Sequence, residues 1–366
     1  MSQSNHIVRV RLGERSYDIE IGAGNLAGVG PFVARRGPVS HAVVVTDANV
    51  ETPHGRRAAE SLAEASAAVD LAVVEPGEQS KSLASAAALW EKLLELGADR
   101  ASVIVAVGGG VIGDLAGFVA ATYARGIRFF QVPTSLLAQV DSSVGGKVGI
   151  NLPEAKNMVG AFLQPRGVLV DTATLETLPE REYRSGLGEV VKYGVILDAA
   201  LFDYLEANAA PLARRDHDAL RRVIARCCRL KADVVEKDER EETGLRAVLN
   251  YGHTFAHAFE TLTGYEQLLH GEAVAVGMLC ASRLAERLGR VDAALTARQR
   301  ELLAALGLPT EAPPLEPDEI LRTMLHDKKV AHGRLRFVLP AELGRVELVG
   351  DVDPEDVRAV LVARQD

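Results

Sequence analysis

The fold is decided by residues 103–114, which read Val-Ile-Val-Ala-Val-Gly-Gly-Gly-Val-Ile-Gly-Asp. The apolar run predicts a buried strand, and the glycines after it predict a tight turn into a helix. Glycines let the backbone approach a phosphate closely, and a helix start offers unpaired N–H groups to it. The pattern is not a complete Gly-x-Gly-x-x-Gly, so a nucleotide site and a plain strand-to-helix turn both remain compatible with it.

Further apolar runs on either side of this stretch predict a parallel sheet. They lie at residues 42–45, 69–74, 102–107, 128–132 and 168–170. Helical stretches separate them, for example residues 80–96, with Ser80 as the expected N-cap and Gly97 just past the last turn. Continuous apolar strands alternating with helices are typical of a sheet covered on both faces. We expect a doubly wound, Rossmann-like α/β domain over residues 1–178.

After residue 178 the pattern becomes helical. Long Ala, Leu, Arg and Glu segments predict helices at 216–242, 253–263 and 272–288. Two short runs at 335–339 and 346–349 predict minor strands, and residues 354–362 predict a closing helix with Asp353 as N-cap and Pro354 first. Residues 179–366 are therefore expected to form a mainly α-helical domain.

Composition limits the class of partner and the compartment. A net charge of −9 is opposite to that of a typical nucleic-acid binder, which predicts a small-molecule or protein partner. Cys227, Cys228 and Cys280 form neither a disulfide framework nor a Cys-x-x-Cys metal motif. No secretion signal is visible, and the longest apolar stretch, 101–113, is shorter than the roughly 20 residues of a membrane span. We expect a cytoplasmic protein without membrane or nucleic-acid partners.

Polar residues at expected strand ends are candidates for ligand binding. Asp47 follows the strand at 42–45 and can accept ribose hydroxyls, and the loop 76–81 follows another strand. Such ends share one edge of an open sheet, where nucleotides bind. Asp141 and Lys147 lie in a polar segment within an apolar region. That segment is either part of a site or a solvated surface loop.

Three features of the helical half could form a metal site. His253 and His257 are four residues apart and share one helix face, His270 follows, and Glu189 is a carboxylate on an apolar helix face. Two histidines and a carboxylate with open positions are a usual donor set for catalytic zinc. Spacing favours the pair His253 and His257, although such pairs also occur on surfaces and in cores. The His-Glu-x-x-His protease pattern is missing.

Seven stretches match one known pattern in order along the chain. They are Gly-Gly-Gly-Val-Ile-Gly-Asp at 108–114, Pro-Thr-Ser-Leu-Leu-Ala-Gln-Val-Asp-Ser-Ser-Val-Gly-Gly-Lys at 133–147, Lys-Asn-Met-Val-Gly at 156–160, Gly-Leu-Gly-Glu-Val-Val-Lys-Tyr-Gly at 186–194, Gly-Leu-Arg-Ala-Val-Leu-Asn-Tyr-Gly-His-Thr-Phe-Ala-His-Ala at 244–258, His-Gly-Glu at 270–272 and Asp-Lys-Lys at 327–329. With these motifs the sequence resembles the 3-dehydroquinate synthase family from about residue 43 to residue 338. One motif could arise by chance, but the ordered set is specific.

The resemblance implies three sets of site residues. The metal ligands would be Glu189, His253 and His270, with zinc expected and cobalt possible. NAD would contact Asp47, Asn49, Gly77, Glu78, Gln79, Ser80, Lys81, Gly109, Gly110, Val111, Ile112, Gly113, Asp114, Thr134, Ser135, Lys147, Lys156, Thr174, Leu175, Glu176 and Thr177. Substrate binding and catalysis would involve Arg125, Asp141, Lys147, Asn157, Lys192, Glu242, Arg246, Asn250, His257 and Lys328. The resemblance thus implies a different ligand set from the one that spacing favours, because the family has His257 near the substrate phosphate and not on the metal.

The family converts 3-deoxy-D-arabino-heptulosonate 7-phosphate to 3-dehydroquinate in the shikimate pathway. NAD oxidises the C5 alcohol, phosphate leaves by elimination, the hydride returns, and ring opening with an internal aldol closure completes the product. Zinc would polarise the hydroxyl that is oxidised, and Lys147 and Lys192 would supply positive charge. In the family the arginine of Tyr-x-Arg-Gly reaches in from a second subunit, so Arg125 implies a homodimer.

The sequence departs from the family pattern at three places. Ser135 follows Thr134 where a second threonine is usual, and Ala256 stands where glycine is usual. The stretch 238–246 carries one extra residue, so the active-site glutamate is Glu241 or Glu242. Its spacing to Arg246 favours Glu242.

Three other functions are compatible with parts of the pattern. A sister sugar phosphate cyclase would act on sedoheptulose 7-phosphate with the same cofactors, but the intact stretch 141–147 argues against it. A metal-dependent polyol dehydrogenase would release NADH, which Arg125 and Asn157 disfavour. A nucleotide-binding module without catalysis would be expected to lack at least one ligand of these sets.

Overall fold

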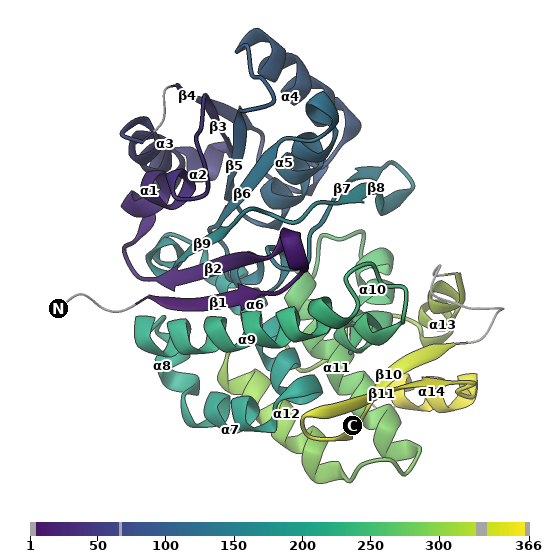
Figure 1. Ribbon diagram of the computed structural model, residues 1–366. Helices are drawn as coiled ribbons and strands as arrows, with labels where there is room; N and C mark the ends of the chain where they lie inside the picture. Colours follow the sequence, from purple (N-terminus) through teal and green to yellow (C-terminus); the bar gives the residue numbers. More distant parts are fainter. Residues whose placement is uncertain (1–4, 66–67, 327–334, 363–366) are drawn as a thin grey trace. The chain divides into compact units, whose positions relative to one another are not determined.

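The computed structural model describes residues 5–65, 68–326 and 335–362 (Figure 1). By internal contacts the chain forms two compact units, the first with residues 1–179 and 220–240 and the second with 180–219 and 241–366. This division differs from the expected one over residues 220–240. They pack with the first unit, where Cys228 Sγ donates to the Gln139 carbonyl at 3.2 Å and Lys231 Nζ to the Asp141 carbonyl at 2.7 Å.

A seven-stranded sheet forms the centre of the first unit, in the order β1-β2-β9-β6-β5-β3-β4. Its strands are β1 (His6–Val10), β2 (Tyr17–Gly22), β3 (Ala42–Asp47), β4 (Val69–Val74), β5 (Val103–Gly108), β6 (Arg128–Pro133) and β9 (Val168–Asp171). The pair β1 and β2 is antiparallel, and all other pairs are parallel. The five expected strands are confirmed as β3, β4, β5, β6 and β9.

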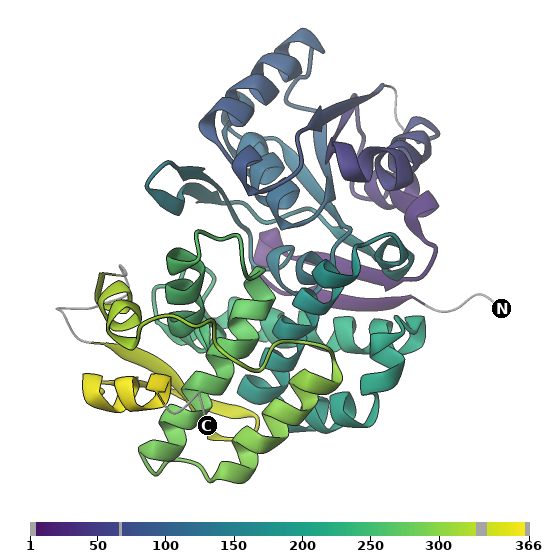
Figure 2. The ribbon, with the colours of Figure 1, turned by 180° about the vertical axis from the view of Figure 1, so that it is seen from behind.

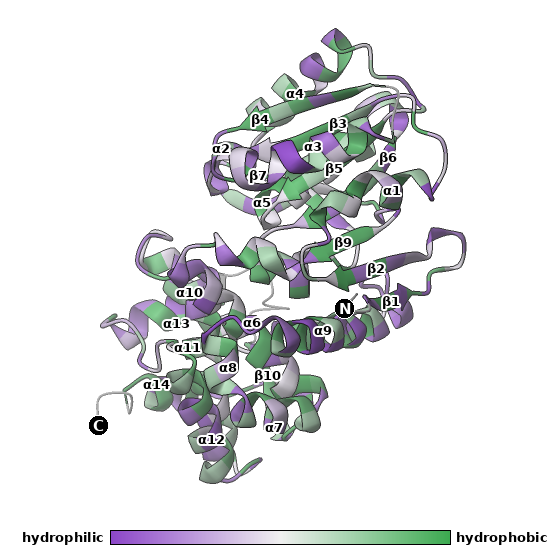
Figure 3. Ribbon diagram, turned by 90° about the vertical axis from the view of Figure 1, so that its left-hand side faces the viewer, coloured by the Kyte–Doolittle hydropathy of each residue, from purple (hydrophilic) through white to green (hydrophobic). Residues whose placement is uncertain are grey.

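Both faces of this sheet are covered, as the continuous apolar runs predict. Val43 and Val45 of β3 pack into one core, while Ala42 and Val44 pack into the other. The strands β3 and β9 accordingly carry mainly hydrophobic colour in Figure 3. The helices of this unit are α1 (Val29–Ala34), α2 (Ala48–Val50), α3 (Arg56–Ala63), α4 (Leu83–Glu95) and α5 (Gly110–Thr122). The doubly wound fold is confirmed.

The start of α4 corrects one expectation. Ser82, not Ser80, is the N-cap, and its hydroxyl accepts from the Ser85 N–H at 3.2 Å. Ser80 lies in a short 3-10 turn instead, where its hydroxyl donates to the Glu75 carbonyl at 2.6 Å. The other end is as expected, since Gly97 has a φ of +67°. Glycine adopts this left-handed conformation without strain.

An antiparallel hairpin after β6 was not expected from the sequence. It consists of β7 (Lys147–Leu152) and β8 (Ala155–Phe162). Gly149 pairs with Gly160, and a Cβ on either would overlap the backbone of the opposite strand. These glycines interrupt the apolar alternation by which a strand is recognised.

The second unit is mainly helical (Figures 1 and 2). Its helices are α6 (Glu180–Leu197), α7 (Ala199–Ala207), α8 (Ala209–Ala213), α10 (His253–Leu262), α11 (His270–Arg287), α12 (Ala293–Ala305), α13 (Pro317–His326) and α14 (Pro354–Val362). The expected late strands are β10 (Arg336–Glu342) and β11 (Arg345–Gly350). Helix α9 (His217–Lys237) ends before the expected residue 242, and α11 begins two residues earlier than expected. In the part of the chain that the structure describes, no helix is long and apolar enough to span a membrane.

Candidate functional site

Three side chains from three helices of the second unit form what we call the metal-site cluster. Glu189 lies on α6, His253 begins α10 and His270 begins α11, and one potential ligand atom from each lies within 4.8 Å of the others. Each histidine Nε2 lies 3.7 Å from Glu189 Oε1. Donors at about 2.1 Å from a shared zinc ion in tetrahedral geometry lie roughly 3.4 Å apart. The cluster therefore has the dimensions of a zinc site.

Glycines allow these helices to approach closely next to the cluster. A Cβ on Gly271 would overlap the Ser185 carbonyl of α6, and one on Gly188 would overlap the Gly271 carbonyl. Gly188 and Gly271 immediately neighbour Glu189 and His270 in sequence. Because a larger residue would separate the backbones, the glycines set the distance between carboxylate and imidazole.

The outer nitrogen of each histidine has a hydrogen-bond partner that orients the ring. His253 Nδ1 lies 3.1 Å from the Tyr251 carbonyl, and His270 Nδ1 lies 3.1 Å from Glu260 Oε1. Both partners accept, so each Nδ1 carries the hydrogen and each Nε2 presents a lone pair toward Glu189. Ligating histidines in metal sites show this arrangement.

A second carboxylate holds the first turn of α11. Glu272 Oε2 accepts from the Leu269 N–H at 2.8 Å, and Arg181 of α6 binds both oxygens of Glu272 at 2.8 and 2.7 Å. This contact ties the first turn of α6 to the first turn of α11. The contact between Arg181 and Glu272 supports the position of His270. The sequence did not predict this contact.

The electrostatics of the metal-site cluster favour a cation. Glu189 is 1% exposed, and neither of its oxygens accepts a hydrogen bond of regular geometry from the described residues, although Lys192 Nζ lies against Oε2. Partial loss of solvation lowers the pKa of His270, but the hydrogen bond to Glu260 and the charge of Glu189 outweigh it, so the pKa lies above its ordinary value. A buried carboxylate and two imidazole lone pairs thus fit a divalent ion such as zinc.

The structure separates His257 from this cluster. Its ring packs edge-on against His253, with 5.7 Å between ring centroids, and it is not among the three residues whose ligand atoms come together.

Three other substrate candidates of the second unit lie close in sequence to a residue of the metal-site cluster. Arg246 and Asn250 lie in the 3-10 turn Leu245–Asn250 that precedes α10. Lys192 lies one turn after Glu189 and is 2% exposed. Lys328 lies outside the described residues.

The extra residue near Arg246 changes which glutamate reaches it. Arg246 Nε lies 3.6 Å from Glu241 Oε1, whereas the spacing argument favours Glu242. Glu241 has a φ of +60°, which turns the chain between α9 and the turn Leu245–Asn250. The contact therefore supports Glu241 as the partner of Arg246.

In the first unit the candidate NAD residues other than Lys147 and Lys156 follow the carboxyl ends of β3, β4, β5, β6 and β9, which we call the nucleotide edge. Gly109 precedes α5 without a side-chain cap, so the first N–H groups of a 13-residue helix remain available for an anion. Thr134 N–H donates to the Gly108 carbonyl at 2.9 Å and holds the end of β6 beside that of β5. The glycine-rich stretch thus forms the strand-to-helix turn that phosphates favour.

Asp47 has a structural contact within this edge. Its carboxylate accepts from the Asn49 and Val50 N–H groups at 2.9 and 3.2 Å and so caps α2. Burial raises the pKa of Asp47 above its ordinary value, although these hydrogen bonds act against it. A partly buried, oriented carboxylate of this kind suits the recognition of ribose hydroxyls.

A buried ion pair links two further residues of the nucleotide edge. Lys81 Nζ lies 2.5 Å from Asp114 Oδ2, and the lysine side chain is 5% exposed. Burial raises the pKa of Asp114 even though Lys81 opposes the shift. Gly77, with a φ of +105°, begins the loop, and Asn151 of β7 donates its N–H to the Lys81 carbonyl at 2.7 Å and its side chain to Glu78 at 2.7 Å. The loop 77–81 is therefore held from α5 and from β7.

Asp141 has a partner that sequence reasoning missed. Lys231 Nζ of α9 lies 2.9 Å from Asp141 Oδ1 and also donates to the Asp141 carbonyl, and its side chain is 8% exposed. Lys231 lies on the buried face of α9, four residues after Cys227 and four before Val235. The signal in the sequence was the position of Lys231, a lysine among the apolar residues that form the buried face of a helix.

Four further candidates of the first unit are exposed. Lys147, Lys156 and Asn157 lie on the hairpin of β7 and β8, and Arg125 ends the 3-10 turn after α5. Asn157 has a φ of +56°, which asparagine tolerates. Ala124 and Arg125 have φ values of +50° and +69°, which are strained for these residue types.

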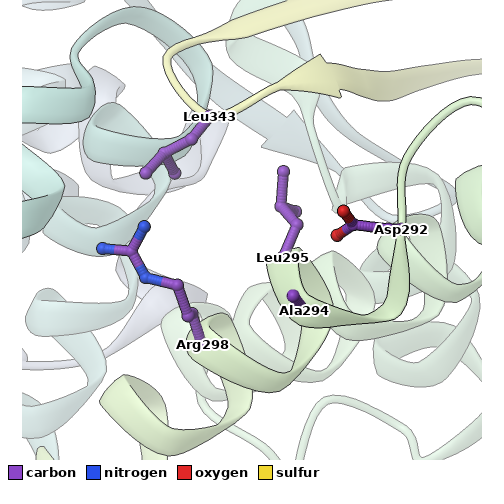
Figure 4. A pocket seen from close by; sticks show the side chains of 5 residues that line it. All are labelled: Asp292, Ala294, Leu295, Arg298 and Leu343. Atoms are coloured by element: carbon purple, nitrogen blue, oxygen red, sulfur yellow. The ribbon is translucent and has the colours of Figure 1, made fainter.

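One pocket of the second unit includes no candidate site residue (Figure 4). Its volume is about 190 Å³, and it is lined by Asp292, Ala294, Leu295, Arg298 and Leu343. The Arg298 guanidinium already binds Asp203 at 2.8 Å and also contacts Glu206. The charge of this arginine is therefore compensated within the protein.

Comparisons with known proteins point to one family. The family model described as 3-dehydroquinate synthase N-terminal matches residues 71–185, and the one described as 3-dehydroquinate synthase C-terminal matches residues 186–330. The 3-dehydroquinate synthase of Rhodopirellula baltica is 48% identical and covers 100% of this chain and 99% of its own length. The 3-dehydroquinate synthase of Desulforamulus reducens is 50% identical, and the match covers 97% of this chain and 99% of that protein.

Solved structures of related synthases are similar over almost the whole chain. A 2-deoxy-scyllo-inosose synthase complexed with carbaglucose-6-phosphate, NAD+ and Co2+ has a TM-score of 0.89 and 29% identity, with 98% of this chain and 100% of that chain covered. A 2-epi-5-epi-valiolone synthase from Streptomyces hygroscopicus with NAD+ and Zn2+ has a TM-score of 0.87 and 29% identity, with 97% and 99% covered. Glycerol dehydrogenase from Schizosaccharomyces pombe, at 18% identity and a TM-score of 0.69, shares the fold. On the two matching family models and the full-length relatives, the chain belongs to the 3-dehydroquinate synthase family.

Proposed function

We propose that this enzyme converts 3-deoxy-D-arabino-heptulosonate 7-phosphate to 3-dehydroquinate and phosphate. The observation that carries the proposal is the metal-site cluster of Glu189, His253 and His270 within a chain that matches 3-dehydroquinate synthases over its full length. When bound, zinc or cobalt would polarise the substrate hydroxyl and NAD would take up and return the hydride. The metal ligands and the NAD contacts are those that the family pattern names.

The residues around the metal-site cluster would bind and orient the substrate. Lys192 is buried and cationic beside Glu189, so it can stabilise an oxyanion that develops next to the metal. Arg246, Asn250 and His257 would contact the substrate, with His257 near its phosphate and Lys328 as a further cation. Arg246 is itself oriented by a glutamate, which we propose to be Glu241 on the basis of their 3.6 Å contact.

The residues of the first unit would bind the cofactor and the acidic parts of the substrate. The start of α5 would accept the NAD pyrophosphate, and Asp47 with Asn49 the ribose. Asp141, Lys147 and Asn157 would contact substrate. Lys231 holds Asp141 in place. We propose that residues 1–178 and 179–366 form the two functional domains, although residues 220–240 pack with the first unit.

A single assay tests the reaction. The purified, zinc-loaded enzyme is given the heptulosonate phosphate and NAD, and inorganic phosphate and NADH absorbance are followed together. We expect stoichiometric phosphate release without net NADH, because the hydride returns to the product. Accumulating NADH would indicate a polyol dehydrogenase, and turnover of sedoheptulose 7-phosphate in its place would indicate a sister cyclase.

We further propose a cytoplasmic homodimer in which Arg125 acts in the partner's site. The exposure and the positive φ of Arg125 support this, because backbone strain of this kind is concentrated at functional positions. Mixing inactive Arg125→Ala and Glu189→Ala proteins tests it. Mixed dimers would contain one intact site, and random exchange would restore about a quarter of the wild-type activity. No restored activity after confirmed subunit exchange would contradict the proposal.

A further inference from the structure

His54 connects two segments that the sheet keeps apart. It lies in the π-helical turn Glu51–Gly55 after β3 and is 5% exposed. Its Nε2 lies 2.7 Å from Thr177 Oγ1, directly after the turn Thr172–Glu176 that follows β9. The strands β6 and β5 lie between β9 and β3 in the sheet. One side chain therefore bridges two ends of the nucleotide edge across two intervening strands.

The direction of this hydrogen bond follows from its neighbours. The Thr177 hydroxyl also lies 3.1 Å from the Thr174 carbonyl, which can only accept, and with its hydrogen directed there its oxygen accepts from His54. In that arrangement the imidazole carries its hydrogen on Nε2. Burial, followed by the charge of Arg57, lowers the pKa of His54 and outweighs the opposing effect of Asp171. His54 thus acts as a neutral N–H donor near neutral pH.

A second buried donor holds the middle of the same turn. Gln139 is fully buried, and its Nε2 lies 3.2 Å from Thr174 Oγ1 and 3.1 Å from the Asp171 carbonyl. The Thr174 hydroxyl donates to that same carbonyl at 2.7 Å. Thr174 and Thr177 therefore each donate to the carbonyl three residues back and each contact one buried side chain.

Asp171 holds the start of the turn. Its Oδ1 accepts from the Ala173 N–H at 2.9 Å and the Gly24 N–H at 2.7 Å, and its Oδ2 accepts from the Leu26 N–H at 2.8 Å. Start and middle are thus held by segments on the β2, β9 and β6 side of the sheet. His54 alone among these contacts comes from the segment after β3, so it decides how the end of the turn lies relative to Asp47.

We propose that His54 is a positioning residue for NAD, which it serves by holding Thr177 in place. The inference rests on the proposed function, in which Asp47 and Asn49 on one side and residues 174–177 on the other contact the cofactor. Without the Nε2–H donor the end of the turn would relax, and the two contact segments would lose their relative position. NAD affinity would fall, while metal binding, which uses residues of the second unit, would not.

Two variants of His54 distinguish the effect of losing the N–H donor from the effect of changing the side-chain volume. His54→Phe keeps a buried ring without a donor, and His54→Gln keeps an N–H at nearly the same reach. By calorimetric titration of the zinc-loaded, full-length protein, we expect His54→Phe to raise the NAD dissociation constant about fivefold to tenfold, as the loss of one hydrogen bond predicts. His54→Gln should stay within about twofold of wild type. In turnover, the KM for NAD should rise and kcat at saturating NAD should persist.

His41→Phe is the matched control. His41 is also buried, at 8% exposed, and its Nε2 lies 2.8 Å from Asp70 Oδ2, but it precedes β3 and so lies at the opposite end of that strand. Its substitution should lower stability without changing NAD affinity. A double-mutant cycle with Thr177→Val should show that the two substitutions are not additive, because they remove the same hydrogen bond.

The outcomes decide the inference in each case. A folded His54→Phe protein that binds NAD as wild type does, or a folded His54→Gln protein as weak as His54→Phe, would overturn it. Should His54→Phe not fold, His54→Asn, whose shorter polar side chain cannot reach Thr177, takes its place with the same expectation. A wild-type protein that does not bind NAD would overturn the proposed function itself, and this inference with it.

Discussion

In the second unit three charged or imidazole side chains meet within 4.8 Å, whereas the first unit offers mainly backbone N–H groups and loops at strand ends. The metal-site cluster is defined by side-chain chemistry, and its glycines and outer partners only adjust its geometry. The nucleotide edge is defined by geometry, and its side chains mostly hold loops in place. We therefore expect a substitution in the metal-site cluster to abolish metal binding. A substitution at the nucleotide edge should lower NAD affinity without abolishing it.

Removal of Glu189 should break the metal-site cluster completely. Glu189→Ala removes the only carboxylate among the three ligand residues of the cluster, so we expect loss of bound zinc and a decrease in kcat of roughly a thousandfold or more. Metal content is measured by mass spectrometry on the purified protein. Glu180→Gln, an exposed change at the start of the same helix, serves as the control. Full zinc occupancy in Glu189→Ala would remove Glu189 from the ligand set.

The pair Glu241→Gln and Glu242→Gln sharpens the assignment next to Arg246. The contact at 3.6 Å predicts that Glu241→Gln lowers kcat about 100-fold, in the range of proton-transfer or orienting carboxylates, while Glu242→Gln stays near wild type. Steady-state kinetics with the heptulosonate phosphate measure both. The reverse result would support the spacing argument for Glu242.

Glu260→Gln tests how strongly the outer partner of His270 acts. The amide keeps the shape but loses the charge that favours a cation at the imidazole, so zinc affinity should fall about 10-fold to 100-fold. Competition with a chromophoric chelator measures it without any turnover. Glu266→Gln, an exposed glutamate after α10, is the control. Unchanged affinity in Glu260→Gln would show that the carboxylate has no role in metal binding.

Lys81→Met should have the smallest effect of this series. It removes the buried partner of Asp114 and loosens the loop 77–81, so the NAD dissociation constant should rise about tenfold. Lys92→Met changes an exposed lysine on α4 that pairs with Glu95, and it should leave NAD binding unchanged. If Lys81→Met abolished NAD binding altogether, the nucleotide edge would not be a graded site, and the contrast with the metal-site cluster would fail.

The sequence predicted five of the seven strands of the main sheet because buried parallel strands are continuous apolar runs, but it did not predict β1 and β2. It missed the hairpin of β7 and β8, whose glycines interrupt the alternation, and it misplaced the start of α4 by two residues because Ser80 and Ser82 are both plausible caps. Boundaries of this kind depend on one local hydrogen bond, here from the Ser85 N–H, which composition does not reveal.

For the metal site, the residues alone made His253, His257, His270 and Glu189 candidates and spacing favoured the pair His253 and His257, whereas the family motifs selected Glu189, His253 and His270. Helical periodicity reports which residues share a face of one helix, but it carries no information about a neighbouring helix. Lys231 and Glu260 were missed for the same reason, since their partners lie far away in sequence, on the segment 139–141 and at the start of α11.

The sequence by itself determined the doubly wound class, the helical second half and, through its motifs, the family. Hydrophobic periodicity and glycine placement are local properties, and both can be determined from short stretches of the sequence. The tertiary structure decided which carboxylate faces which imidazole, which lysine is buried against Asp141, and that His54 reaches Thr177 across two strands. Those contacts depend on how closely helices and strand ends approach in space, and many sequences with the same local pattern would place them differently.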